Sequence, residues 1–379
     1  MGIRLSHSAA SRYRQCPQKY FLAKKWQTNK KGSALVFGTA IEEGITQILV
    51  TDSLDEGISK FYIWWENENG DKKKPIFDNP AVEYFKSDYD KDLVKSDSTF
   101  VEESYKELLG DYKEWSTWGE AWETAMEYRD HEGPEFPEFY DDLMKFMNRV
   151  YWWSCRLKGR YMIKAFYEQI YHEIEEVVEI GGKTGNQLKI ELKNEDGDSI
   201  VGYLDYGLKF KGRDNPTITD CKTAAQPYDD HKIDTSEQLR TYVSYINGRY
   251  GTNFDAAYLV LLKKLTKSKF CPKCKTEYDN RKRKCDGSKC NGAKLETTFK
   301  GDCQLLFTEY SEELLEDVLI DYENIAEAID NEIVFRNTDS CFNFGRKCEF
   351  YEVCWKSKKP EEVDQLVPKK ENKKRSKAK

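Results

Sequence analysis

The chain has 379 residues, enough for one large domain with insertions or for two smaller domains. Apolar residues make up 39% and aromatic residues 14% of it, which excludes a disordered chain despite a charged fraction of 34%. No run approaches the roughly 18 consecutive apolar residues of a membrane span, and the first residues have no secretory-signal pattern. The sequence therefore predicts a cytoplasmic protein without a membrane partner. In such a reducing compartment, spaced cysteines bind metal more often than they form disulfides, so we expect metal ligands among the 11 cysteines.

The net charge of −7 is distributed unevenly. Residues 51–150 alone sum to −14, so the rest of the chain sums to +7. A nucleic-acid partner is therefore not excluded, because local charge governs such binding more than the whole-chain balance does.

In chain order, apolar residues at helical spacing first predict helices over 5–25 and 36–50. The acidic segment 51–165 follows and contains seven tryptophans. These side chains could stack single-stranded bases, but the negative charge favours an inserted helical subdomain in which they form the core.

The second half of the chain has short β-rich runs that are broken by turns and mixed with helical patterns. The predicted strands are 173–180, 188–192, 199–210, 216–222 and 256–262. The predicted helices are 236–247 and 311–334. We therefore expect an α/β core in which a central mixed sheet is flanked by helices.

Two acidic residues and a lysine occur near the ends of neighbouring predicted strands. Asp220 and Lys222 are two residues apart on one strand, so their side chains lie on the same face. Asp205 joins them if the two strands pair as a hairpin. Oxygen ligands suit Mg²⁺, and a lysine stabilises developing negative charge, so the set favours metal-assisted phosphodiester hydrolysis. The alternative is two turn acids and a solvated lysine.

Four blocks together resemble the PD-(D/E)XK nuclease superfamily, specifically its RecB-type branch. They are the serine-rich segment 5–20 ending in Cys16-Pro17-Gln18-Lys19-Tyr20, the segment 37–43, the pair Gly202-x-x-Asp205 and Asp220-x-Lys222, and Gln238-x-x-x-Tyr242. The resemblance implies the fold of a restriction-endonuclease-like core and the activity of a nuclease.

The same resemblance implies roles for individual residues. Asp205, Asp220 and the Cys221 carbonyl would bind Mg²⁺ or Mn²⁺, with Lys222 as the catalytic lysine. Gln238 and Tyr242 would help to position DNA and the active site. Glu42 would be a further metal ligand, where the branch usually has histidine. This departure leaves the metal preference open, although a third carboxylate favours Mg²⁺.

A first set of cysteines is divided between the two ends of the chain. Cys341, Cys348 and Cys354 lack a fourth ligand, which Cys16 can supply. Four thiolates suit a [4Fe–4S] cluster or a structural zinc ion, and the spacing does not decide between them. The arrangement resembles the iron–sulfur staple of AddB and CRISPR-associated RecB-like exonucleases, which favours the cluster. We expect the two ends to be joined through the metal alone.

A second set is compact: Cys271 and Cys274 are followed by Cys285 and Cys290. A polar excursion of about thirty residues cannot bury a core, so a structural Zn²⁺ is the physical way to fold it. Its many lysines and arginines are consistent with phosphate contact or with a solvated face.

We therefore predict nuclease-core helices (1–50), an acidic helical insertion (51–165), the catalytic sheet (166–266), a zinc-ribbon insertion (267–300), a C-terminal helix with its cysteine loop (301–356) and a basic disordered tail (357–379). The predicted function is metal-dependent DNA hydrolysis, as an exonuclease on single strands or duplex ends in recombination or repair. One alternative is a nuclease subunit with a helicase, recombination or CRISPR-adaptation partner. The other is a catalytically idle relative that binds DNA or protein.

Overall fold

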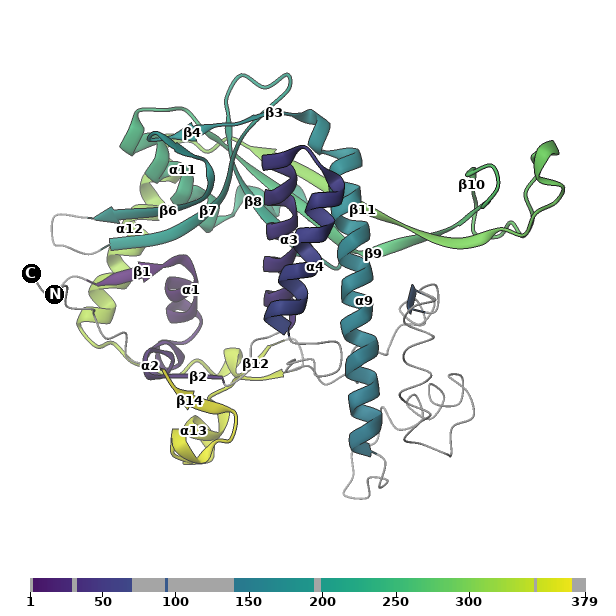
Figure 1. The fold of residues 1–379 in the computed structure, drawn as a ribbon. Coiled ribbons are helices and arrows are strands. Elements are labelled where there is room, and N and C mark those ends of the chain that lie inside the picture. The colour runs from purple at the N-terminus through teal and green to yellow at the C-terminus, as the bar shows by residue number, and fades with distance from the viewer. Residues whose placement is uncertain are drawn as a thin grey trace, which may run out of the picture.

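The computed structural model describes residues 3–28, 33–69, 93–94, 140–193, 199–343 and 346–369. Within them, the core is an eight-stranded mixed sheet with helices packed on it (Figure 1). The central strands are β7 (Ser199–Phe210), β8 (Thr217–Ala224) and β9 (Asp255–Phe270). The remaining strands of this sheet are β1 (Arg4–Ser6), β3 (Ile174–Val177), β6 (Asn186–Lys193), β10 (Glu277–Tyr278) and β11 (Glu296–Thr308). The α/β core predicted from the sequence is confirmed.

Both faces of the sheet are buried. On β9, Leu259 and Leu261 belong to one hydrophobic cluster, whereas Tyr258 and Val260 belong to another. This alternation follows from the two-residue period of a strand, and it explains the near-continuous apolar run there. Helices α3 (Ser33–Thr51), α4 (Leu54–Asn69) and α9 (Tyr140–Gln169) pack in the first cluster, and α11 (Glu237–Tyr250) packs in the second.

The N-terminal helical segment is divided in two, which differs from the single helix expected over 5–25. After β1 come α1 (His7–Gln15) and α2 (Pro17–Lys25). Cys16 between them is extended, with φ −165° and ψ 107°. A residue before proline is disfavoured in the helical region, so Pro17 ends the first helix and begins the second.

The flanks of the acidic segment are part of the same core. α4 and α9 pack against α3, and Trp65 and Trp152 are almost fully buried there. For these residues, the core interpretation of the tryptophans is confirmed. Trp115, Trp118 and Trp122 lie outside the described residues.

Within the described residues, one helix is long and apolar enough to cross a membrane. The window Ala34–Thr51 in α3 has a mean hydropathy of 1.2, and 39% of it is buried. Ile41, Ile45 and Ile48 on this helix are fully buried against the sheet and the neighbouring helices. α3 thus packs as a core helix, and its apolar character is accounted for by that packing.

The C-terminal part returns to the N-terminal part. α12 (Glu312–Asp330) packs with α1 in a third cluster, and β14 (Leu366–Pro368) pairs antiparallel with β2 (Trp26–Thr28). Shorter elements are η1 (Tyr171–Glu173), β4 (Glu179–Ile180), β5 (Lys183–Thr184), α10 (Asp230–Asp234), η2 (Ser288–Cys290), η3 (Thr338–Cys341), β12 (Phe342–Asn343), β13 (Arg346–Lys347), α13 (Tyr351–Trp355) and η4 (Pro360–Glu362). Within the predicted basic tail over 357–379, η4 and β14 form, whereas residues 370–379 lie outside the described residues.

Candidate active site

The sheet is split beside β7, and the split holds the first carboxylate. One edge of β7 pairs with β1 at residues 199–201 and with β8 at residues 206–208. Asp205 lies in the interval between these two partners. Its Oδ2 accepts a hydrogen bond from the backbone N–H of Cys221 on β8, at 2.8 Å. The hairpin expected from the sequence therefore forms and brings Asp205 beside β8.

A network of polar side chains connects β8 with α11. Asp220 and Lys222 lie on the face of β8 that packs towards this helix, with Lys222 Nζ 2.6 Å from Asp220 Oδ2. Lys222 Nζ also donates to Gln238 Oε1 at 3.3 Å, and Gln238 Nε2 donates to Asp220 Oδ1 at 3.0 Å. The same Nε2 lies 3.4 Å from the Tyr242 hydroxyl. These four side chains therefore lie together, as their sequence spacing suggests.

Gly202 provides space for Tyr242. A Cβ atom at residue 202 would lie 2.7 to 3.0 Å from three atoms of the Tyr242 side chain. Only glycine allows the strand to approach the ring this closely. The Gly202-x-x-Asp205 pattern thus has a steric cause: the glycine admits the α11 side chain, and the aspartate follows at the split.

Glu42 joins the site from α3. The hydroxyl of the buried Tyr206 on β7 donates to the Glu42 backbone carbonyl at 3.1 Å and lies 3.2 Å from Thr46 Oγ1, which fixes the helix against the strand. Burial, then the Asp220 carboxylate, raises the pKa of Glu42 to about 7. Burial and the Asp220 and Glu42 charges also raise the pKa of Asp205 well above its ordinary value.

Lys222 is the local counter-charge. Burial alone would lower the pKa of Lys222, but the adjoining Asp220 carboxylate, and then Asp205, raise it above the ordinary lysine value. The ammonium group is therefore retained between the carboxylates. One positive charge next to three acidic groups leaves an excess of negative charge in a partly enclosed site.

This donor set suits a hard divalent cation. Asp220 Oδ2 is buried and accepts no hydrogen bond of good geometry from the described residues, although Lys222 Nζ is near. The N–H and C=O of one strand residue point to the same edge, so we expect the Cys221 carbonyl to face Asp205 as its N–H does. Mg²⁺ prefers such carboxylate and carbonyl oxygens.

His7 is a neighbour of the site that the sequence did not indicate. Its Nδ1 lies 3.3 Å from the Tyr322 hydroxyl on α12 and 3.9 Å from Glu237 Oε2 on α11. Burial lowers the pKa of His7, Glu237 opposes this shift, and Lys222 adds to it. The four histidines show no ligand spacing along the chain. Only the parallel pairing of β1 with β7 brings the first residue of α1 near Lys222.

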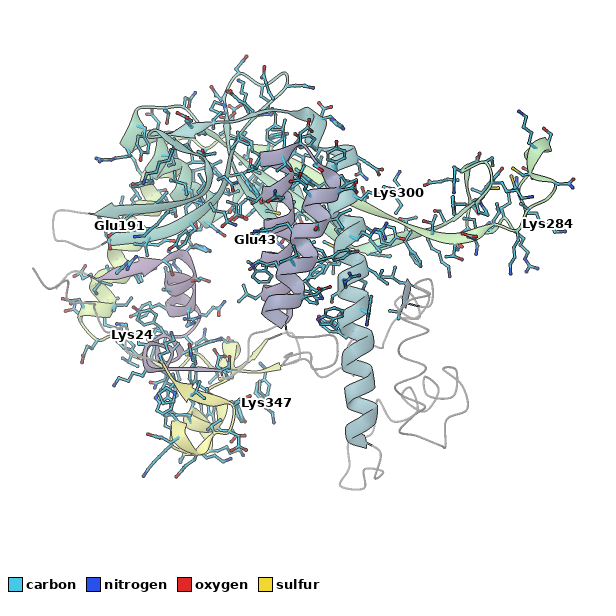
Figure 2. All side chains as sticks on the ribbon, viewed as in Figure 1. Lys24, Glu43, Glu191, Lys284, Lys300 and Lys347 are labelled. Carbon is cyan, nitrogen blue, oxygen red and sulfur yellow. The ribbon has the colours of Figure 1, made fainter. Side chains whose placement is uncertain are left out.

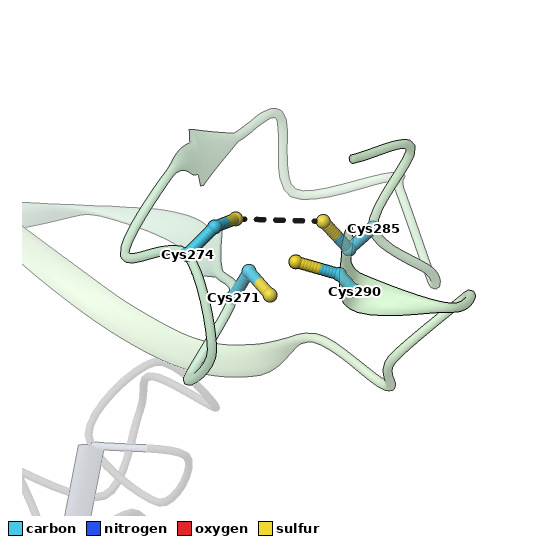
Figure 3. Close-up of side chains that lie close together, drawn as sticks. All are labelled: Cys271, Cys274, Cys285 and Cys290. Atoms are coloured by element: carbon cyan, nitrogen blue, oxygen red, sulfur yellow. Dashed lines mark hydrogen bonds between the residues drawn. The ribbon is translucent and has the colours of Figure 1, made fainter. Parts of the chain in front are cut away.

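The compact cysteine set gathers at the end of the β9–β11 hairpin (Figure 3). Within the part of the chain that the structure describes, one metal-ligand group has all its ligand atoms within 4.8 Å of one another: Cys271, Cys274, Cys285 and Cys290. The sulfurs of Cys274 and Cys285 are 3.6 Å apart. Tetrahedral zinc with Zn–S bonds of about 2.3 Å would separate its sulfurs by about 3.8 Å. The spacing therefore suits one zinc ion.

Hydrogen bonds stabilise the thiolate form of two of these cysteines. Hydrogen bonding with Thr276 lowers the pKa of Cys274 to about 6, and the Tyr278 hydroxyl, 3.1 Å from Cys285 Sγ, lowers the pKa of Cys285. The backbone N–H of Gly287 also donates to Cys285 Sγ at 3.3 Å. Thiolates are the ligating form of cysteine, so these contacts favour metal binding by Cys274 and Cys285. Hydrogen bonding with Cys274, and then burial, raises the pKa of Cys290 to about 12.

The divided cysteine set lines a single cavity. Cys16 between α1 and α2 meets Cys341, Cys348 and Cys354 from the C-terminal loop. Trp355 Nε1 donates to Cys341 Sγ at 3.3 Å. Among the described residues, the compact group of tightly spaced ligand atoms is the one at the hairpin tip, and this divided set is not part of it. Each thiolate of a [4Fe–4S] cluster binds a different iron, so a wider spacing suits a cluster better than a single ion.

The expectation that metal alone joins the chain ends is wrong. The Gln15 carbonyl accepts hydrogen bonds from Asn337 Nδ2 at 2.9 Å and from Ser340 Oγ at 2.8 Å. Lys19 Nζ lies 3.1 Å from Glu349 Oε2. With the β2–β14 pairing, these contacts hold the two ends together directly, which the sequence did not reveal because every partner is more than 300 residues away.

The structure is thus an α/β core in which carboxylates and a lysine lie together where the sheet is split beside β7. The family model of the PD-(D/E)XK nuclease superfamily matches residues 99–355, more than half of the chain. The chain belongs to this superfamily, whose fold implies a metal-dependent nuclease with DNA as its substrate. A search of curated proteins gave no match.

Proposed function

We propose that this protein is a DNA exonuclease of the RecB-type branch that acts on single strands or duplex ends in recombination or repair. The observation that carries the proposal is the meeting of Glu42, Asp205, Asp220 and Lys222 at the split beside β7, next to Gln238. The serine-rich N-terminal segment and the divided cysteine set are the features that resemble this branch.

In this proposal Glu42, Asp205, Asp220 and the Cys221 carbonyl hold one or two Mg²⁺ ions. When bound, the metal supplies the positive charge that activates a water and offsets charge on the attacked phosphate. Lys222 orients the water and stabilises the negative charge that develops on the phosphate oxygens. Gln238 holds both Asp220 and Lys222 in place by its two hydrogen bonds, and Tyr242 limits the movement of Gln238.

The test is digestion of end-labelled DNA, single- and double-stranded, linear and circular, with Mg²⁺ or Mn²⁺. An exonuclease degrades the linear substrates and spares the circles. Asp220→Ala should abolish cleavage, whereas Asp230→Ala is the matched control, because Asp230 and Lys232 repeat the acid-x-lysine spacing on the short helix α10. Cleavage of circles would replace the exonuclease proposal by an endonuclease, and parental activity of Asp220→Ala would refute the site.

For the divided cysteine set we propose a [4Fe–4S] cluster. Protein purified without oxygen should be brown and contain iron and sulfide, and Cys16→Ser should lose both. Cys303→Ser is the control, because Cys303 is a partly buried thiol that contacts Gln169 and the Ala165 carbonyl and does not line the cavity. Zinc without iron or sulfide at this site would overturn the cluster.

For the compact set we propose Zn²⁺, so Cys271→Ser with Cys274→Ser should lose zinc and retain iron. We propose a cytoplasmic location, because a reducing compartment keeps the cysteines of both sites from forming disulfides. A helicase or recombination protein as partner would be detected by co-purification with the intact chain.

A further inference from the structure

The β9–β11 hairpin continues well beyond the core as an arm. β8 ends its pairing with β9 at Leu262, but β9 runs on to Phe270 with β11 as its partner. Leu265 and Phe299 are the last arm residues buried in the main hydrophobic cluster. Figure 1 shows the arm projecting away from the sheet, and Figure 2 places Lys300 near its base and Lys284 near its end.

The arm is strongly cationic. Residues 263–300 contain thirteen lysines and arginines and four acidic residues. Its tip has a groove of about 590 Å³, lined by two residues of β9, by the run 280–284 and by two residues of the returning chain. We call this set the cationic groove: Lys267, Lys269, Arg281, Lys282, Arg283, Lys284 and Lys294.

Several of these charges lack an internal counter-ion. Lys282 pairs with Asp286. Within the described part of the chain, no ion pair involves Arg281, Arg283 or Lys284. Lys284 also forms an isolated antiparallel bridge with Lys294, which sets two like charges directly opposite each other. Such a pair opposes folding, so an external anion would stabilise the groove.

The form of the groove favours a phosphate backbone over unpaired bases. Its lining is cationic, with Asn280 and Leu295 as the other residues, and includes no aromatic side chain on which a base could stack. Proteins that hold single strands combine positive charge with such aromatic platforms. Duplex DNA offers closely spaced phosphates on a rigid rod, which a rigid arm can meet at a fixed distance.

That distance follows from the strand register. Lys222 of the active site pairs in register with Val260 of β9, and Lys267 and Lys269 lie seven and nine residues further along the same strand. At about 3.3 Å per residue the groove is about 23–30 Å from the level of Lys222. At about 3.4 Å per base pair, this length corresponds to about 7–9 base pairs.

We propose that the arm is a second DNA-binding site, in which the cationic groove binds the phosphate backbone of a duplex about 7–9 base pairs from the cleaved phosphate. The position of the cleaved phosphate rests on the proposed function, but the binding of duplex by the arm does not. The four cysteines serve this role by fixing the tip, whose own buried cluster comprises only Cys271, Cys285, Cys290 and Leu295 among the described residues.

The test compares full-length variants in an Asp220→Ala background, which prevents cleavage without a chelator that would remove zinc. The arm variant carries Arg281→Gln, Arg283→Gln and Lys284→Gln. The control carries Lys183→Gln, Arg249→Gln and Lys356→Gln, which removes three charges from exposed positions elsewhere. Unchanged zinc content of the arm variant verifies that its tip is folded.

Fluorescence anisotropy then measures binding to DNA hairpins with stems of 6 and 20 base pairs. The arm variant should bind the long stem about tenfold more weakly than the control, and its log–log salt slope should become shallower by about 0.9 for each phosphate that the arm no longer neutralises. Both variants should bind the short stem equally, because it ends before the groove.

Equal binding of the long stem by both variants would overturn the proposal, and an equal loss on both stems would overturn the spacing. A single strand or poly-glutamate that competes as well as the long duplex would also overturn it, as a general polyanion site. Failure of the proposed function looks different: the protein with Asp220 intact would then cleave no DNA, whatever the arm binds.

Discussion

The active site and the tip of the arm keep charged groups together in different ways. At the active site, β7, β8, α3 and α11 each contribute one or two side chains, and the core on both faces of the sheet fixes them. At the tip, the buried cluster of the described residues is three cysteines and a single leucine, with the fourth cysteine, Cys274, exposed beside them. A core can therefore hold repelling carboxylates before any metal binds, whereas the tip, under the zinc proposal, would need its metal to fold.

The largest expected effect is on catalysis alone. Under the proposed mechanism, Lys222→Ala should lower the cleavage rate by about 100- to 1,000-fold, because it removes the cation that would stabilise charge on the attacked phosphate. Zinc content and tip folding should not change. Lys232→Ala is the matched control, since that lysine lies over the Tyr228 ring on the surface. Single-turnover cleavage is the measurement, and a near-parental rate would contradict the role of Lys222.

The reciprocal experiment removes two cysteines from the tip of the arm and should unfold the tip without destabilising the core. In the variant with Cys271→Ser and Cys274→Ser, loss of the metal should increase trypsin cleavage within residues 281–284 by about a hundredfold, because the metal is what closes this segment. The melting temperature of the core and the cleavage of short substrates should be retained. Limited proteolysis with mass spectrometry locates the cut. Loss of core stability would show that the two regions are not independent.

Glu42 differs from the other two carboxylates of the site because it lies on a helix, whereas Asp205 and Asp220 lie on strands. Glu42→Ala should lower activity in both Mg²⁺ and Mn²⁺ by about tenfold if it is a ligand, and Glu42→His should raise the ratio of Mn²⁺ to Mg²⁺ activity. Glu43→Ala is the adjacent control, since Glu43 faces Lys60 at 3.6 Å. Unchanged rates for Glu42→Ala in both metals would make it a structural acid only.

The smallest effect concerns how the core holds the site. Gly202→Ala would force the Tyr242 ring to move, so we expect a loss of stability of about 1–3 kcal/mol and a few-fold loss of activity. Gly248→Ala on α11 is the control, because its Cβ would meet no atom within 4 Å, and alanine there should be neutral or stabilising. Thermal melting and steady-state cleavage distinguish the two. Equal effects would mean that Tyr242 is not held by this packing.

Local patterns were enough to predict much of the core. The strand over 199–210 and the helices around Ile41 and Leu239 follow from two-residue and helical periods, which depend on near neighbours only. The pairing of Asp220 with Lys222 and the compact cysteine group follow from the same short spacings. The interruption of the helix at Cys16 is not predicted, because apolar residues at helical spacing lie on both sides of it and the effect of Pro17 is confined to the one preceding residue.

Residue types at short spacing were therefore sufficient for the α/β class, for the superfamily and for the residues that supply the acidic, lysine and cysteine groups. The folded chain was needed to show that Glu42 reaches Asp205 and Asp220, that His7 lies beside them, and that the chain ends touch directly. It was also needed to show that the compact cysteine set lies at the end of an arm. These features depend on which distant strands share an edge, and that choice is made by burial of the whole sheet, which no local pattern records.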